Sequence, residues 1–276
     1  MAKDPGFITE LAADTSYAGY LRLDRLFAAQ QPRSSHHDEM LFIIQHQTAE
    51  LWMKLLVHEL SAAIAHVRED RLAPCFKILA RVKQVQRLLF EQWAVLETLT
   101  PSEYVQFRDV LGPASGLQSQ QFRAVEFLLG NKNAGILEVH RHDAQGHAWL
   151  QKLLRAPGLY DEFLRFLARA GMPVPRAVTE RDWAQPYARH DGVVAVFRTI
   201  YENTREHWEA YDMCEKLVDV EENFQLWRFR HVKTVERIIG FKRGTGGTAG
   251  VPFLRKTLEV ALFPELIEVR TQIGVR

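Results

Sequence analysis

The sequence predicts an all-α protein, built as a single helical domain over residues 1–276. Long stretches place apolar residues three and four positions apart, which is the spacing of an amphipathic helix. The apolar-polar alternation of β-strands occurs nowhere, and no internal repeat is visible. A chain of 276 residues, 47% hydrophobic and 25% charged, suits one large globular domain or two small ones. Because no boundary stands out, we predict one domain of long packed helices.

Charge and cysteine usage narrow the class of protein. The 35 basic and 34 acidic residues give a formal net charge of +1, which favours neither nucleic acid nor a membrane surface. The N-terminus has no apolar signal core, and no run of about 18 apolar residues could span a bilayer. Cys75 and Cys214 are far apart in sequence, which is typical of reduced thiols. We therefore expect a cytoplasmic protein without nucleic-acid or membrane partners.

Residues 16–30 are predicted to form an amphipathic helix before the connector QPRSS. Tyr17, Tyr20 and Leu21 lie together on it. Such a helix can pack on its own domain, which is the more common case, or reach a neighbouring protomer.

Residues 36–60 read as a buried helix that carries a polar band. Its two apolar stripes predict that it faces protein on most sides; they contain Leu41, Ile44, Leu51 and Leu55 and also Phe42, Met53 and Leu56. Phe42, His46 and Glu50 are spaced by four and share a face. A buried polar band needs partners or a ligand. A single histidine in this setting is more often a core residue that bonds to a neighbour.

The next segments are predicted to be three helices. Residues 71–99 form one, with Pro74 in its first turn. Thr100, Pro101 and Glu103 then give the capping box of another. It carries Tyr104 and Arg108 on one face, where the arginine is either a surface residue or a clamp for a carboxylate. After the turn GPASG, residues 118–131 form a helix that ends at Gly130 or Asn131.

Residues 136–170 are expected to hold two or three shorter helices. His140, His142 and His147 lie close together there, but their spacing matches no standard zinc pattern and no cysteine joins them. We therefore disfavour a metal site in this segment. Residues 171–191 carry three prolines and are expected to be an irregular connector.

Residues 192–240 are helical in pattern, with a break predicted near Asp219, where a capping-box signature recurs with Glu222. His231 follows Trp227 by one turn on the apolar face of the second piece. Residues 244–250, GTGGTAG, match neither a phosphate loop nor a dinucleotide fingerprint. They are a flexible tether or a mobile lid that offers Thr245 to a ligand. Two short helices are expected to follow.

Three kinds of protein could place two histidines in buried helices. A haem enzyme uses one neutral histidine as an iron ligand and the other on the opposite side of the cofactor. A di-iron carboxylate bundle needs Glu-x-x-His pairs, and no glutamate here is followed by histidine three residues later. A non-enzymatic helical scaffold explains the helices but not the polar band. The residue pattern favours the haem enzyme.

Five motifs resemble tryptophan 2,3-dioxygenases in their order along the chain. They are YLRLDRLFAAQ, HHDEMLFIIQHQTAELWMKLL, YVQFRDVLGPASGLQSQQFR, WRFRHVKTVERIIG and GTGGTAG. The resemblance extends from about Tyr17 to the C-terminal helices, with small departures at Ala49 and Ala249. It implies an all-helical protomer of a homotetramer that binds haem b, with ferrous iron in the active form.

The resemblance also implies roles for individual residues. His231 in FRHVK matches the axial ligand of the haem iron. His46 matches the catalytic residue on the distal side that contacts the indole N–H. Ser115 and Gly116 match residues that line the distal haem side. The substrate-binding positions that the resemblance implies are Phe42, Ile43, Ile44, Gln45, His46, Tyr104, Arg108 and Thr245, with Tyr17, Tyr20 and Leu21 from a neighbouring protomer.

The activity implied by the resemblance is the first step of tryptophan catabolism by the kynurenine pathway. Both atoms of O₂ are added across the indole C2–C3 bond of L-tryptophan to give N-formyl-L-kynurenine. The polar band of residues 36–60 would then be part of a substrate site. Arg108 would hold the carboxylate, and Phe42 with His46 would orient the ring.

Overall fold

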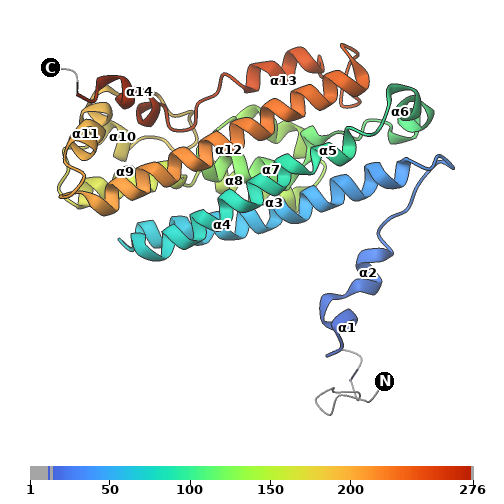
Figure 1. Cartoon of the computed structure of the whole chain (residues 1–276), viewed down its shortest axis with the longest axis horizontal. Coiled ribbons are helices and arrows are strands. Elements are labelled where there is room, and N and C mark those ends of the chain that lie inside the picture. Colours follow the sequence, from blue (N-terminus) through green and yellow to red (C-terminus); the bar gives the residue numbers. More distant parts are fainter. Residues whose placement is uncertain (1–11, 13–14, 275–276) are drawn as a thin grey trace.

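Three long helices form the frame of the protein in its computed structural model, which describes residue 12 and residues 15–274. They are α3 (Glu39–Arg68), α4 (Leu72–Glu91) and α12 (Trp208–Ile239). Helix α4 packs on both α3 and α12, and Figure 1 shows the three rods side by side. No strand occurs among the described residues, and the predicted all-α class is confirmed.

The core lies where these rods meet the shorter helices. Helix α7 (Gln120–Leu129) and helix α9 (Leu159–Arg169) both pack against α3. The spacing of the apolar residues of α3 explains this, because every third or fourth one is buried from Met53 onward. Ile44 and Leu51 are instead 47% and 51% exposed. We expected both apolar stripes of this helix to be buried. That expectation is wrong at Ile44 and Leu51, which belong to one of the two stripes.

Local capping fixes the segment between α4 and α7. Trp93–Leu96 form the short helix α5. The predicted capping box of α6 (Pro101–Phe107) is present, with Glu103 and Thr100 bonded reciprocally through side chain and backbone. The chain then tightens into the 3₁₀ helix η1 (Arg108–Leu111). Helix α7 ends as predicted at Gly130, whose φ of 102° suits the left-handed position after a helix.

The second half of the chain has one boundary in a different place from the prediction. The remaining elements are η2 (Gly116–Gln118), η3 (Ala134–His140), α8 (Ala144–Leu154), α10 (Arg176–Thr179), α11 (Asp191–Glu202), α13 (Val251–Thr257) and α14 (Pro264–Gln272). The predicted break near Asp219 is wrong, because α12 runs through it and the chain breaks at 203–207. Asp219 accepts a bond from Lys83 of α4 at 2.8 Å, so its carboxylate joins two helices instead of capping one.

The N-terminal segment also differs from the prediction. Residues 16–30 form two short helices, α1 (Tyr17–Leu21) and α2 (Leu23–Phe27), separated by Arg22 at a φ of 52°. Neither helix has a buried residue, and Figure 1 shows both leading away from the bundle. Tyr17 and Tyr20 are 78% and 80% exposed. The two short helices therefore bury no residue on their own domain, although Ala29 and Gln30 at the end of the segment bond to Gln47 of α3.

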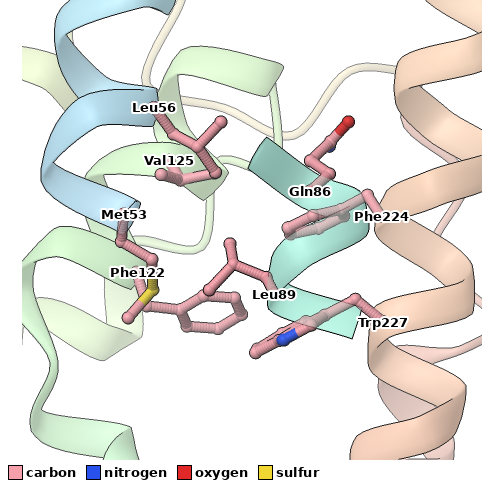
Figure 2. Close-up of a pocket in the computed structure, with 8 residues that line it drawn as sticks. All are labelled: Met53, Leu56, Gln86, Leu89, Phe122, Val125, Phe224 and Trp227. Atoms are coloured by element: carbon pink, nitrogen blue, oxygen red, sulfur yellow. The ribbon is translucent and has the colours of Figure 1, made fainter. Parts of the chain in front are cut away.

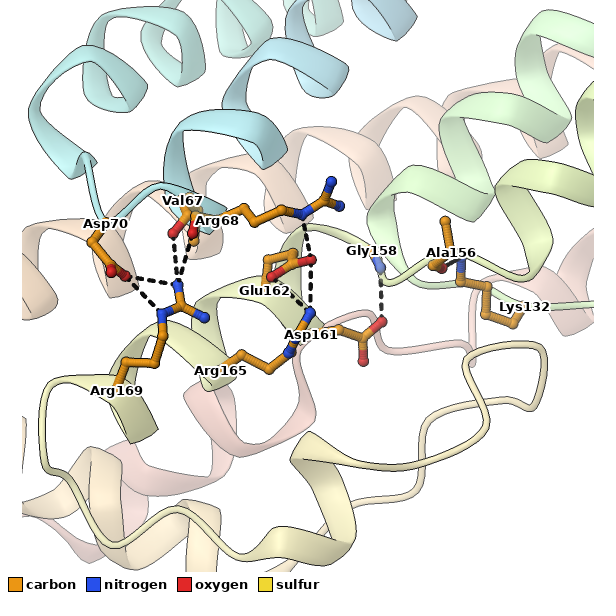
Figure 3. A network of polar contacts seen from close by, with 10 residues as sticks. All are labelled: Val67, Arg68, Asp70, Lys132, Ala156, Gly158, Asp161, Glu162, Arg165 and Arg169. Carbon is orange, nitrogen blue, oxygen red and sulfur yellow. Dashed lines mark hydrogen bonds and ion pairs between the residues drawn. The ribbon is translucent and has the colours of Figure 1, made fainter.

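A polar network closes one end of the bundle. Arg68 at the end of α3 and Arg165 of α9 both donate to the buried carboxylate of Glu162, at 3.0 and 3.1 Å (Figure 3). Arg169 donates to Asp70 at 2.8 Å in the turn that follows α3. The bond from Arg68 to the fully buried Glu162, together with that from Arg169 to Asp70, holds α9 against the end of α3. The opposite end of α3 is where the candidate site lies.

No helix of the described part of the chain is both long and apolar enough to cross a bilayer.

Candidate functional site

The candidate site lies where α3 begins and α12 ends. Both helices reach the same end of the bundle, beside α5 and α6 and the Gly-rich loop that follows α12 (Figure 1). Because α3 and α12 run in opposite directions, an early residue of α3 and a late residue of α12 come together. These residues are His46 and His231.

His46 is held in one tautomer by the backbone of its own helix. Its Nδ1 lies 2.7 Å from the carbonyl oxygen of Phe42, one turn earlier. A carbonyl can only accept, so Nδ1 carries the proton and Nε2 keeps its lone pair. Burial lowers the pKa of His46, and the bond to Phe42 opposes this shift. His46 is therefore a neutral imidazole that can accept a hydrogen bond through Nε2.

Aromatic side chains form one wall beside His46. The ring centroid of Phe42 lies 4.1 Å from that of His46, 6.0 Å from that of Tyr104 and 5.7 Å from that of Phe107. Burial raises the pKa of Tyr104, and the positive charge of Arg108 opposes that rise. The hydroxyl of Tyr104 therefore stays protonated near neutral pH, beside a guanidinium group.

His231 packs against two tryptophans. Its ring stacks on Trp93 with centroids 4.9 Å apart and planes 9° apart, and the Trp227 centroid is 5.6 Å away. Burial, followed by the positive charges of His46 and Arg123, lowers the pKa of His231 to about 4. The influence of His46 on this pKa places the two histidines, which come from α3 and α12, near each other. At neutral pH His231 is a neutral imidazole, the form that binds a metal.

Arg123 is the charged residue that the sequence analysis missed. It pairs with Glu126 on the same helix, and its guanidinium lies 4.3 Å from the centroid of the Phe122 ring. Its Nε is buried and has no partner in the described part of the chain. A signal was present, because the apolar helix QQFRAVEFLL carries an arginine and a glutamate three residues apart. The side chain brings a positive charge near His231.

The Gly-rich loop is docked onto the rest of the site. Arg108 donates to the carbonyl of Arg243 at 2.6 Å, and the hydroxyl of Thr245 donates to the carbonyl of Ala114. A Cβ on Gly246 would lie 2.6 Å from the Cβ of Ser115. The loop is therefore more than a tether, because only a glycine fits at its closest approach to Ser115.

Some of the predicted site residues lie apart from this cluster. Tyr20 and Leu21 are exposed on α1, away from the bundle, and Ile44 faces outward. Gly116 is exposed, Ile43 is half-buried and Gln45 is buried. Among residue 12 and residues 15–274, no group of three or more histidine, cysteine, aspartate or glutamate residues is arranged to hold a metal ion.

An apolar pocket lies deeper in the bundle, between α3, α4, α7 and α12 (Figure 2). Its volume is about 10 Å³, far below the several hundred Å³ of a typical ligand site. It cannot hold an indole ring. Its lining residues are Met53, Leu56, Gln86, Leu89, Phe122, Val125, Phe224 and Trp227.

Comparison with known proteins decides the family. The tryptophan 2,3-dioxygenase family model matches residues 4–199 and 190–273. The chain belongs to the tryptophan 2,3-dioxygenase family. Proteins of that name are similar over almost the whole chain. The one from Serratia proteamaculans is 61% identical over 273 residues, covering 98% of both chains. Those from Myxococcus xanthus and Xanthomonas oryzae are 62% and 60% identical, covering 98% and 99% of this chain and 94% and 92% of their own.

The tryptophan 2,3-dioxygenase family is haem-dependent, and the donor groups at this site fit a haem. His231 is neutral and its ring is fixed, as an axial ligand requires. Three buried donors have no partner among the described residues: the indole nitrogens of Trp93 and Trp227 and the Nε of Arg123. Unpaired buried donors are rare, and a cofactor or ordered water is the usual explanation.

We predict that Gly246→Ala loosens the loop of this tryptophan 2,3-dioxygenase homologue. The added Cβ would overlap Ser115, so the loop must move and its bond to Ala114 weakens. The weaker bond should lower the free energy of opening of the loop by about 1 kcal/mol. Backbone amides of residues 244–250 should then exchange with solvent at least about fivefold faster. Gly135→Ala is the control, because its Cβ would make an ordinary 3.4 Å contact. Equal exchange in both variants would contradict the docking.

Proposed function

We propose that the protein is a haem-dependent dioxygenase that adds both atoms of O₂ across the indole C2–C3 bond of L-tryptophan, giving N-formyl-L-kynurenine. The observation that carries this proposal is the neutral imidazole of His231, stacked on Trp93 at the end of the bundle where His46 also lies. The family membership and the names of the relatives support the same activity.

His231 is the residue that would hold the iron of haem b, with Ser115 and Gly116 near its distal side. The neutral imidazole and its aromatic surroundings support this role. Haem, ferrous in the active protein, supplies the activation of O₂, and the protein supplies binding and orientation. The alternatives of a di-iron bundle and a helical scaffold account less well for a stacked, neutral histidine.

The indole ring of tryptophan would lie against Phe42 with its N–H directed at Nε2 of His46. Because the proton is on Nδ1, Nε2 is the nitrogen that can accept a hydrogen bond. This geometry makes His46 an acceptor for the ring nitrogen whether or not it later takes the proton. Ile43 and Gln45 belong to the same turn of α3 and would complete this part of the substrate site, whereas the predicted Ile44 faces outward.

The polar end of tryptophan has its own contacts in this proposal. Tyr104 and Arg108 would bind the carboxylate, and Thr245 the ammonium group. Arg108 uses one nitrogen for the carbonyl of Arg243, so the rest of the guanidinium can still donate to an anion. Closing the Gly-rich loop over these groups would exclude water from the reacting atoms.

The protein is proposed to act as a homotetramer in the cytoplasm. Tyr17, Tyr20 and Leu21 would enter a neighbouring protomer's pocket, and their exposure on α1 supports this. The buried thiols of Cys75 and Cys214 suit a reducing compartment. Residues 1–276 are proposed to form one domain, because the main apolar core draws on helices from α3 to α14.

Substitution of His231 and substitution of His46 are predicted to impair different properties, haem binding in the first case and tryptophan binding in the second. His231→Ala should lose haem and its Soret absorption, because the iron loses its ligand. His46→Ala should keep about one haem per chain and bind tryptophan about two- to tenfold more weakly, for one lost hydrogen bond. Absorption spectra and tryptophan titrations measure both effects. Haem loss in His46→Ala with a normal ferrous spectrum in His231→Ala would reverse the assignment, and a wild-type protein that takes up no haem would reject the function.

Arg108 is predicted to act through the substrate carboxylate. Losing one partner of a buried charge pair costs about 2 to 5 kcal/mol, so Arg108→Ala should lower kcat/KM for tryptophan at least tenfold. Turnover of tryptamine, which has no carboxylate, should change little. That comparison separates the clamp from the bond to Arg243, whose loss would affect both substrates. A similar loss with tryptamine would remove Arg108 from carboxylate binding.

Deleting residues 1–30 is predicted to impair assembly and substrate binding together. The deletion removes the exposed aromatic surface of α1 and leaves the core intact. Light scattering should show a smaller particle, and the KM for tryptophan should rise several-fold. A control with Tyr17→Ser and Tyr20→Ser tests the aromatic rings alone. A truncated monomer that binds tryptophan normally would contradict the shared pocket.

A further inference from the structure

Trp93 is buried at the junction of α5 and α12, and none of the roles proposed above includes it. It is 8% exposed and packs in the small core of residues at this end of the bundle. Its indole lies parallel to the ring of His231, with centroids 4.9 Å and planes 9° apart. Trp227 contacts both rings, at 6.0 Å from Trp93 and 5.6 Å from His231.

This arrangement differs from the usual support of a metal-binding histidine. Such a histidine normally gives its second N–H to a carboxylate or a backbone carbonyl, which fixes the ring. Two carboxylates lie near Trp93 in the sequence, and both are engaged elsewhere. Glu91 pairs with Arg87, and Glu97 lies one turn further on. Glu97 accepts two bonds from Arg230, at 3.0 and 3.1 Å, and one from Thr234 at 2.9 Å.

The Glu97 contacts explain how the stack is held in place. Arg230 immediately precedes His231, and Thr234 follows it by three residues on α12. Bonds from both to Glu97 fix α5 against α12 on either side of His231. A two-bond arginine–carboxylate pair also sets the orientation of its partners. The indole face of Trp93 is thereby presented to the imidazole.

We propose that Trp93 is a positioning residue that fixes the plane of the His231 imidazole by stacking. This inference rests on the proposed function, in which His231 holds the iron. The indole is rigid, with two rotatable bonds, and no described residue bonds to its buried N–H. Shape and ring overlap therefore define its position. Without that face, the imidazole can turn about its Cβ–Cγ bond.

The test compares Trp93→Met with Trp93→Phe in the holoenzyme. Methionine fills the volume but has no ring face, whereas phenylalanine keeps one. Trp208→Met is the control, because Trp208 is 62% exposed at the far end of the same helix as His231. Two readouts report on the ligand: the iron–histidine stretching band of the ferrous protein in resonance Raman spectra, and the rate of haem transfer to apomyoglobin.

For Trp93→Met we expect a shifted or broadened iron–histidine band and haem loss about two- to tenfold faster, from the usual strength of an aromatic pair. Trp93→Phe should lie closer to the wild type, and Trp208→Met should match it. A Trp93→Met protein with the wild-type band and the wild-type rate would overturn the inference. So would a change of the same size in Trp208→Met.

Two further results keep the test decisive. If Trp93→Met does not fold, as judged by circular dichroism, Trp93→Leu takes its place, because leucine is also apolar and has no ring face. Trp93→Leu should then lose haem measurably faster than the wild type, and wild-type values in both readouts would overturn the inference. Results that reject the proposed function can be told apart from results that reject this role of Trp93. If the proposed function is wrong, the wild-type protein binds no haem, or His231→Ala retains it.

Discussion

The candidate site depends on a buried pair between Arg228 of α12 and Glu126 of α7. Their side chains meet at 3.1 Å, and each is less than a tenth exposed. Glu126 also pairs with Arg123, and Arg228 donates to the carbonyls of Thr257 and Val260 in the segment after α13. Removing one partner of such a pair typically costs about 3 to 5 kcal/mol, because the other charge stays buried. Since Arg228 precedes His231 by three residues, this pair fixes the part of α12 that carries the histidine.

Much of the fold was accessible from local sequence signals. The capping box at Thr100 and the glycine after α7 are rules of backbone chemistry that need no tertiary information, and both were predicted correctly. The signature at Asp219 failed because a capping residue must also lie where the helix stops. Its carboxylate bonds to Lys83 of another helix, and nothing nearby in the sequence interrupts α12. Local patterns cannot report such a contact between distant segments.

The site was predictable where its residues share one helix, and not where they come from several. Phe42 and His46 are four residues apart, so helical geometry alone places their rings together, as their 4.1 Å centroid distance shows. Trp93 and Arg123 approach His231 from α5 and α7, and no spacing in the sequence encodes that approach. The exposed Tyr17 and Tyr20 show a further limit. Residues proposed to complete a neighbour's pocket have no partner within one chain, so the fold of a single chain does not locate them.

The two histidines show how environment divides the work between identical side chains. Both are neutral near pH 7, because burial is the first cause of the lowered pKa in each. The bond from His46 to the carbonyl of Phe42 uses the Nδ1 proton and leaves Nε2 with a lone pair that can accept a hydrogen bond. His231 is held by stacking of one ring face on Trp93, and Trp227 lies tilted beside it. Face contacts leave the edge of an imidazole, where both nitrogens lie, accessible to a metal. Hydrogen bonding at one nitrogen suits a substrate contact, and stacking suits an axial ligand, so the packing around each ring accounts for its proposed role.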